Sequence, residues 1–296
     1  MSIHPSRVAM ITGGNSGIGF ATARKLAAKG FHVIMASRNQ QTSAQAIARI
    51  KADQPNASVE SIPLDLASFA SVRQCAAAFQ ANGYPLHMLI NNAGGAIQGK
   101  QASFTIDGFE MTFGTNHLGH FLLTNLLLED LKRSAPARVI TVSSQRHIPG
   151  YGGGKGAQFD WDNLKGEKFY DSAVFYNNSK LANVWFTYEL QRRLESTGVT
   201  SNAVCPGFVP EAIGDRRTSA FDRLLYRRIL PLMPFARTLD QASSSYLLVA
   251  TDPQWEGVGG KFITDGKERL SSDESYDEAK ARKLWDLSWA WCGLDA

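Results

Sequence analysis

Short apolar runs alternate with longer amphipathic segments from the beginning of the chain to about residue 205. The apolar runs have the length of strands that are buried on both faces, whereas the segments between them repeat their apolar residues with a helical period. Such an alternation predicts a parallel sheet with right-handed crossovers. We expect strands at 8–11, 32–36, 59–64, 86–90, 138–143 and 199–205, with helices between them, including a long one at about 109–133.

No linker divides the chain, and no internal repeat is visible. The predicted fold class is therefore α/β: one doubly wound Rossmann domain over residues 1–296, with a central parallel sheet of about seven strands and helices on both faces. The glycine-rich region at about 145–171 lacks periodicity and is interpreted as an irregular insertion. The region at about 208–237 mixes apolar residues with arginines, and three interpretations stay open: a substrate lid, a basic segment that contacts a membrane or a partner, or a surface helix packed on the sheet.

The composition is that of a soluble globular protein, with 44% hydrophobic and 20% charged residues. A net charge of +4 is too small to indicate a nucleic-acid partner. The cysteines, Cys75, Cys205 and Cys292, are far apart, which fits a reducing compartment and gives neither a disulfide framework nor a zinc site. We find no signal-peptide pattern and no apolar stretch of about 18 residues, so we expect a cytoplasmic protein without a membrane-spanning segment.

A glycine-rich turn, residues 12–19, directly follows the first predicted strand and opens a helix. Glycines there allow a tight turn, a close approach of the backbone to a pyrophosphate, and packing of the helix on the strand. The helix N-terminus adds unpaired N–H groups and a favourable dipole. This pattern predicts a dinucleotide site that includes Gly13, Asn15, Ser16, Gly17, Ile18 and Gly19.

Polar and small residues end the next strands at the same edge of the sheet. Arg38 ends the second strand, where an acidic residue would bind a free ribose 2′-hydroxyl, and its guanidinium suits a 2′-phosphate instead. The sequence therefore favours NADP(H) over NAD(H). We expect Asp65 to accept a hydrogen bond from the adenine amino group, and small residues after the fourth strand to let the backbone lie against the cofactor. These strand ends add Asp65, Leu66, Asn92, Ala93 and Gly94 to the predicted cofactor site.

Tyr176 and Lys180 are four residues apart, which places both side chains on one face of a helix. A phenol with a reference pKa of roughly 10 is a poor acid or base at neutral pH. A lysine cation held beside it favours the phenolate and makes proton transfer accessible. Alone, the pair would be two ordinary helix residues, but beside a dinucleotide site it indicates proton transfer chemistry.

Four motifs in this order, Thr-Gly-x-x-x-Gly-Ile-Gly, Asn-Asn-Ala-Gly, Ser-Ser and Tyr-x-x-x-Lys, resemble those of the short-chain dehydrogenase/reductases. The resemblance covers about residues 7–265. Segments 115–121, 179–183 and 281–288 look most like the retinol dehydrogenase group, and part of the pattern is similar to the light-dependent protochlorophyllide reductases.

The resemblance implies an NADP(H)-dependent oxidoreductase that interconverts a carbonyl and an alcohol on a fairly apolar substrate, such as a retinoid, steroid, lipid aldehyde or polyketide-like ketone. One alternative is light-dependent reduction of a carbon–carbon double bond. Another is a dinucleotide-sensing or scaffold protein without turnover.

The resemblance also assigns roles to individual residues. Tyr176 would be the general acid that protonates the carbonyl oxygen, and Lys180 would assist it and hold the nicotinamide ribose. Ser144 would hydrogen-bond the same oxygen, and Asn116 would complete a proton relay through water to Lys180. The turn after the sixth strand would add Pro206, Gly207 and Val209 to the cofactor site.

Two departures from the family pattern affect these roles. The insertion lengthens the interval between Ser144 and Tyr176, so we expect a reshaped entrance to the active site. Glu211 stands where a hydroxyl usually contacts the nicotinamide amide, which is expected to weaken cofactor binding.

Two further expectations concern metal binding and assembly. His117 and His120 are three residues apart on a helix, but no carboxylate or third histidine lies at a matching interval, so no metal site is predicted. Both a homodimer and a monomer fit the sequence, because relatives dimerise through the helices of Asn116 and Tyr176, whereas the insertion could block that face.

Overall fold

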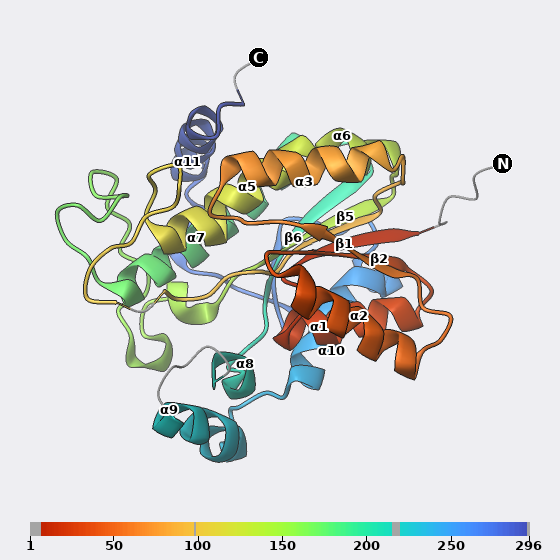
Figure 1. Ribbon diagram of the computed structural model, residues 1–296. Helices are drawn as coiled ribbons and strands as arrows, with labels where there is room; N and C mark the ends of the chain where they lie inside the picture. The colour runs from red at the N-terminus through yellow and green to blue at the C-terminus, as the bar shows by residue number, and fades with distance from the viewer. Residues whose placement is uncertain (1–6, 98, 215–219, 295–296) are drawn as a thin grey trace.

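An eight-stranded β-sheet forms the centre of the molecule (Figure 1). The structure is a computed structural model, and it describes residues 7–97, 99–214 and 220–294. The strands are β1 (Val8–Thr12), β2 (His32–Ser37), β3 (Val59–Pro63), β4 (Met88–Asn91), β5 (Ala137–Val142), β6 (Val199–Cys205), β7 (Lys261–Thr264) and β8 (Lys267–Arg269). Their spatial order is β3-β2-β1-β4-β5-β6-β7-β8, and all neighbours are parallel except β7 and β8.

Helices cover both faces of this sheet (Figure 1). One face carries α1 (Gly17–Ala28), α2 (Gln40–Asp53) and α10 (Leu239–Thr251). The other face carries α3 (Phe69–Ala81), α5 (Gly119–Leu126), α6 (Leu128–Arg133) and α7 (Ser172–Arg193), and α11 (Glu278–Trp291) packs against α7. Short 3₁₀ turns, η6 (Pro253–Trp255) and η7 (Asp273–Tyr276), flank β7 and β8. The predicted doubly wound α/β fold is confirmed.

Alternate residues of the central strands point to opposite faces and contribute to the two largest hydrophobic cores. In β1, Val8 and Met10 belong to the core under α3, α5 and α7, whereas Ala9 and Ile11 belong to the core under α1 and α10. All four side chains are fully buried. A strand that is buried on both faces needs apolar residues at every position, which is why it has the continuous apolar sequence noted above.

The last two strands, β7 and β8, are the part of the sheet that was not placed from the sequence, and β8 is the one without any apolar pattern. Its three residues are all exposed, so it contains no apolar run. Asp265 and Gly266 connect it to β7 with φ angles of 56° and 69°, in the left-handed region that a two-residue hairpin turn requires. In the sequence, the Asp-Gly pair after a short apolar run could therefore have indicated this hairpin.

The long helix expected at about 109–133 is interrupted. It consists of α4 (Met111–Phe113), a π-helical turn η1 (Gly114–Leu118), α5 and α6, with a break at Leu127. π turns within helices are frequent at functional sites. Here the π turn contains Asn116, one of the predicted catalytic residues.

The two regions that interrupt the alternation of strands and helices, 145–171 and 208–237, contain only short helical segments in the parts that the structure describes. Residues 145–171 contain only the short turns η2 (Gln145–His147) and η3 (Tyr151–Gly153). The described parts of 208–237 form α8 (Pro210–Gly214), α9 (Ala220–Leu224), a π turn η4 (Leu225–Ile229) and a 3₁₀ turn η5 (Leu230–Leu232), and these helical segments protrude from the body of the protein (Figure 1). Arg216 and Arg217 lie outside the described residues.

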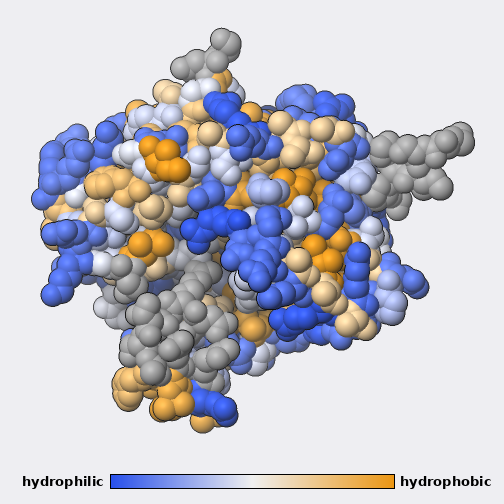
Figure 2. All heavy atoms as spheres, in the orientation of Figure 1, coloured by the Kyte–Doolittle hydropathy of each residue, from blue (hydrophilic) through white to orange (hydrophobic). Residues whose placement is uncertain are grey.

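Apolar side chains of the protruding segment face solvent, and Figure 2 shows apolar surface on it at the lower left. The exposed fractions are 72% for Phe221, 79% for Leu232 and 64% for Phe235. The interpretation in which these side chains pack on the sheet is therefore wrong. The two ends of the segment meet, because the N–H of Arg237 donates to the carbonyl of Phe208 at 2.7 Å. Within the described ranges, no helix combines the length and apolar character needed to cross a membrane.

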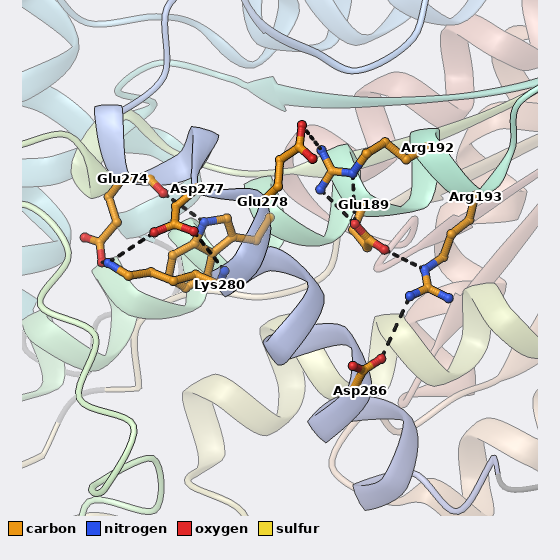
Figure 3. Close-up of polar contacts among 9 residues, drawn as sticks. Glu189, Arg192, Arg193, Glu274, Asp277, Glu278, Lys280 and Asp286 are labelled. Atoms are coloured by element: carbon orange, nitrogen blue, oxygen red, sulfur yellow. Dashed lines mark hydrogen bonds and ion pairs between the residues drawn. The ribbon is translucent and has the colours of Figure 1, made fainter.

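Ion pairs link α11 to α7 (Figure 3). Glu189 of α7 accepts from both Arg192 and Arg193 at 2.8 Å, and Arg193 also reaches Asp286 of α11 at 3.9 Å. Lys280 of α11 pairs with Glu274 at 3.0 Å. The outer part of α7 is thus covered by the C-terminal part of the same chain.

Candidate active site

The glycine-rich turn lies between β1 and α1, as predicted. Gly13 and Gly17 have φ angles of 66° and 54°, in the region that favours glycine. A Cβ atom on Gly19 would lie 2.3 Å from the carbonyl oxygen of Gly13, so only glycine allows α1 to approach the turn this closely. Ser16 precedes α1, and its side chain makes no capping hydrogen bond to the helix. The free N–H groups and hydroxyl at this helix start suit a phosphate.

Arg38 is exposed at the end of β2, and in the described part of the chain no acidic side chain pairs with it. Asn15 of the glycine turn donates to the Thr42 hydroxyl at 2.7 Å, which fixes the turn beside the start of α2. The phosphate turn and the arginine therefore border one region at the carboxyl ends of β1 and β2. This arrangement fits a dinucleotide whose ribose carries a phosphate.

Asp65 and Leu66 follow β3, and each has a structural contact. The Asp65 carboxylate accepts from the backbone N–H of Ala67 at 3.0 Å, so it shapes the turn. Leu66 packs against α5, where a Cβ atom on Gly119 would lie 2.7 Å from the Leu66 carbonyl oxygen. The contact between Asp65 and an adenine amino group stays a prediction.

Thr12 joins the end of β1 to the residues that follow β4. Its hydroxyl oxygen accepts from the backbone N–H groups of Asn92 and Ala93, both at 2.9 Å, and the Asn92 amide donates to the Thr12 carbonyl at 2.8 Å. Gly94 has a φ of 139°, and a Cβ atom on it would lie 2.3 Å from Oδ1 of Asn116. The loop after β4 is thus held flat against β1 and the π turn.

Asn116 is fully buried and connects that loop to α7. Its Nδ2 donates to the Ser179 hydroxyl at 2.9 Å and to the Gly95 carbonyl at 3.1 Å, while its Oδ1 accepts from the Gly95 N–H at 3.0 Å. Ser179 in turn donates to the carbonyl of Tyr176 at 2.7 Å. Asn116 therefore fixes the start of α7, and its part in a water relay to Lys180 stays a prediction.

Tyr176 and Lys180 lie on one face of α7, with Nζ of Lys180 5.6 Å from the centre of the Tyr176 ring. Lys180 is only 4% exposed, and its Nζ donates to the carbonyl of Val142 at 3.1 Å. Ser143 donates from its hydroxyl to the carbonyl of Lys180 at 2.7 Å. These bonds fasten α7 to the end of β5, directly before Ser144.

The predicted residues after β6 lie along the same edge of the sheet. Gly207 has a φ of 78°, and Val209 is 3% exposed. The following helix α8, which carries Glu211, reaches the glycine turn, since a Cβ atom on Gly17 would lie 3.8 Å from Cβ of Ala212. The turn after β6 therefore borders the cofactor region, and the effect of Glu211 on binding stays a prediction.

A cavity of about 250 Å³ lies between the insertion and α7. Its lining includes Phe159, Lys168 and Phe169 of the insertion, and Phe175 and Asn178 of α7. Tyr176 is not among its lining residues, so this cavity is not the place where a substrate would meet the Tyr–Lys pair.

His120 is a residue of the site whose position the sequence did not indicate. Its Nδ1 lies 3.0 Å from the Asn116 carbonyl, and its Nε2 lies 2.9 Å from the Thr12 hydroxyl. That hydroxyl already accepts two N–H groups, so it donates its proton to Nε2. Burial lowers the pKa of His120 to about 4, which agrees with a neutral ring. In the sequence, only the position of His120 one helical turn after Asn116 could have indicated that its side chain lies at the site.

Neither His120 nor His117 is placed as a metal ligand. His117 lies 3.0 Å from the Ser288 hydroxyl of α11 and packs among aromatic rings. In the part of the chain that the structure describes, no group of three or more His, Cys, Asp or Glu side chains is arranged to hold a metal ion.

Known proteins with similar sequences indicate the family of this chain. The profile of the family described as short chain dehydrogenase matches residues 7–157. Retinol dehydrogenase 12 of Mus musculus is 42% identical over 290 residues, which are 98% of this chain and 87% of that protein. Polyprenol dehydrogenase of Homo sapiens is 40% identical over 296 residues, with 98% and 86% covered.

Solved structures show the same fold. An uncharacterised protein from Mycobacterium paratuberculosis has a TM-score of 0.72 and 33% identity, and the match covers 97% of this chain and 93% of that one. A polyketide ketoreductase solved with NADPH has a TM-score of 0.64 at 24% identity.

The parallel sheet, the glycine turn and the Tyr–Lys pair at one sheet edge define an oxidoreductase of the nicotinamide-dinucleotide-dependent class. The matching profile and the relatives at 40% and 42% identity identify the family within that class. The chain belongs to the short-chain dehydrogenase family, and its predicted similarity to the retinol dehydrogenase group is confirmed.

Proposed function

We propose that this chain is an NADP(H)-dependent enzyme that interconverts a carbonyl and an alcohol on an apolar substrate. The observation that carries the proposal is the position of Tyr176 and Lys180 on one face of α7, fastened to the end of β5 beside Ser144. The glycine turn, with its unused Ser16 hydroxyl and open helix start, fits the phosphates of a dinucleotide. Such a cofactor, when bound, supplies the hydride.

The residues of the chain supply the proton and stabilise charge. In reduction, Tyr176 donates its phenolic proton to the carbonyl oxygen, and Ser144 donates a hydrogen bond to the same oxygen. The Lys180 ammonium, held by the Val142 carbonyl, stabilises the phenolate that remains on Tyr176. Alcohol oxidation uses the same groups in the opposite direction.

Arg38 is the residue that we propose selects NADP(H). Replacing it with aspartate removes a charge-assisted contact worth about 1.5–3 kcal/mol and adds a repulsive charge, so NADPH should bind at least about tenfold more weakly. Fluorescence titration with NADPH and NADH measures both affinities. Arg269→Asp makes the same change of charge on the exposed strand β8 and should alter neither affinity. An Arg38→Asp protein with unchanged cofactor preference would remove Arg38 from the phosphate site.

We propose that residues 208–237 form the substrate lid and that the substrate is apolar. Two observations support this. The segment contacts the cofactor region through α8 and presents exposed Phe and Leu side chains. Two relatives are named for retinol and for a polyprenol, and both names denote apolar alcohols.

Turnover of a carbonyl panel tests the proposed function. Aliphatic, aromatic, retinoid and steroid aldehydes and ketones are mixed with enzyme and NADPH in the dark, and NADPH oxidation is followed together with alcohol formation. We expect turnover in the dark, with the apolar carbonyls preferred. Activity only under illumination, with loss of a carbon–carbon double bond, would support the alternative reductase chemistry. NADPH binding without any turnover would support a sensing role.

We propose that the chain is a monomer. The outer part of α7 packs against α11, where Phe186 stacks on Trp285 at 5.9 Å, and against the insertion, where Phe159 contacts Trp185 at 5.0 Å. The chain therefore covers a helix face that would otherwise be open to a second copy. Light scattering after size-exclusion chromatography should give a mass near 32.4 kDa. A mass near twice this value would contradict the proposal.

A further inference from the structure

His147 is a buried imidazole beside the active site that the proposed chemistry does not yet use. It lies in η2, three residues after Ser144, and is 1% exposed. Its ring packs edge-on against Phe262 of β7, with ring centres 5.2 Å apart. A fully buried polar ring that follows a catalytic serine so closely needs a reason for its presence.

Two backbone contacts fix the protonation state of this ring. Nδ1 lies 2.5 Å from the carbonyl oxygen of Ser144, and Nε2 lies 3.2 Å from the backbone nitrogen of Ser272. A carbonyl can only accept a hydrogen bond, and a backbone N–H can only donate one. The proton therefore lies on Nδ1, and Nε2 carries none. Burial also lowers the pKa of His147, which agrees with a neutral ring.

We propose that His147 is a positioning residue that fixes the backbone of Ser144, so that the serine hydroxyl points to the carbonyl oxygen of the substrate. The inference rests on the proposed function, because it assigns His147 a role only through Ser144. Apart from the imidazole, the contacts of Ser144 in η2 are long: the backbone N–H groups of His147 and Arg146 reach its carbonyl and its hydroxyl at 3.3 Å each. The Nδ1–H bond is therefore the short contact that sets its orientation.

The same imidazole connects Ser144 to the helix of the Tyr–Lys pair. Ser272, which donates to Nε2, follows Ser271, whose hydroxyl lies 2.8 Å from the Tyr188 hydroxyl on α7. Ser144 and α7 are thus braced by one short segment before α11. Orientation of this kind matters because a displacement of about 1 Å at a catalytic group can cost about 100-fold in rate.

Two substitutions separate the two contacts of the ring. In His147→Asn, the amide nitrogen can occupy the place of Nδ1 and still donate to Ser144, but the contact with Ser272 is lost. In His147→Gln, the amide oxygen can occupy the place of Nε2 and still accept from Ser272, but the donor to Ser144 is lost. We expect kcat to fall about 10- to 100-fold in His147→Gln and less than about threefold in His147→Asn, with the Kd for NADPH unchanged in both.

A double-mutant cycle with Ser144→Ala shows whether the effect passes through the serine. If His147 acts by orienting the hydroxyl, His147→Gln should cause no further loss of kcat once that hydroxyl is absent. Losses that multiply in the double variant would overturn the proposal, as would equal kcat values for His147→Asn and His147→Gln. Thermal melting of each variant shows whether the protein still folds. A loss of fold would lower kcat in proportion to the folded fraction, and it would not make the effect of His147→Gln disappear in the Ser144→Ala background.

A measurement without substrate tests the hydrogen bonds of His147 independently of the proposed function. In wild-type protein with ¹⁵N-labelled histidine at pH 7, the His147 ring should show a protonated Nδ1 and an unprotonated Nε2. The opposite tautomer or a charged ring would overturn the proposal even if carbonyl turnover is found. A carbonyl panel without turnover would instead contradict the proposed function, and the nitrogen spectrum would still decide the His147 contacts.

Discussion

Tyr176→Phe is expected to lower kcat about 10²- to 10⁴-fold, the range typical of loss of a positioned general acid. Phenylalanine keeps the ring that lies 5.6 Å from Nζ of Lys180 but has no proton to donate. The cofactor affinity should change little, because the phosphate contacts lie at the glycine turn and Arg38. Initial rates with the best carbonyl of the panel, measured at saturating NADPH, give the ratio of the kcat values of wild type and variant.

A matched control removes a hydroxyl from a different tyrosine. Tyr170 precedes α7, and its hydroxyl lies 3.4 Å from the carboxylate of Glu110. Tyr170→Phe should keep kcat within about threefold of the wild type, because this hydroxyl lies outside the proposed proton path. If both variants retain wild-type rates, Tyr176 is not the proton donor and the proposed mechanism is wrong.

The fold was predictable because its signals are local. The first strand, β1, is a continuous apolar run, and a segment with a helical period follows it. The features of the fold that were not predicted also have local causes. β8 is too short and too exposed to have a pattern, and the π turn around Asn116 spans only five residues, too few for its different period to be recognised in the sequence.

The active site was predictable only in part. Tyr176 and Lys180 are one helical turn apart, so their common face follows from spacing. The choice of Ser144 over Ser143 came from resemblance, and the structure adds the physical reason, since the Ser143 hydroxyl is already bound to the carbonyl of Lys180. The roles of buried histidines were not predictable, because the partner of His120 lies 108 residues away.

Acid is expected to destabilise the protein by several kcal/mol below pH 6.5. Burial holds the pKa of His117 at about 3 and that of His120 at about 4, whereas an unfolded histidine has a pKa of about 6.5. Between these values the unfolded chain binds protons that the folded chain does not. The free energy of unfolding therefore has its full value above pH 6.5 and decreases as the pH falls toward 4.

Each of the two histidines contributes a slope of up to about 1.4 kcal/mol per pH unit. Together they should cost about 2 kcal/mol between pH 6.5 and 5.5, a large share of a typical stability of about 5–15 kcal/mol. Urea denaturation at pH 7.5, 6.5 and 5.5 measures this change, with the m value checked for constancy.

His117→Phe isolates the contribution of one ring. His117 already lies among aromatic side chains, with its ring centre 5.2 Å from that of Phe113, so phenylalanine should fit the site. The variant loses the contact with Ser288 and starts from a lower stability at pH 7.5. Its slope below pH 6.5 should nevertheless be smaller than that of the wild type by up to about 1.4 kcal/mol per pH unit, because one buried base is lost while His120 and His147 remain. An unchanged slope, or a wild-type stability that is constant from pH 7.5 to 5.5, would show that these rings accept protons in the folded state and that burial does not keep them neutral.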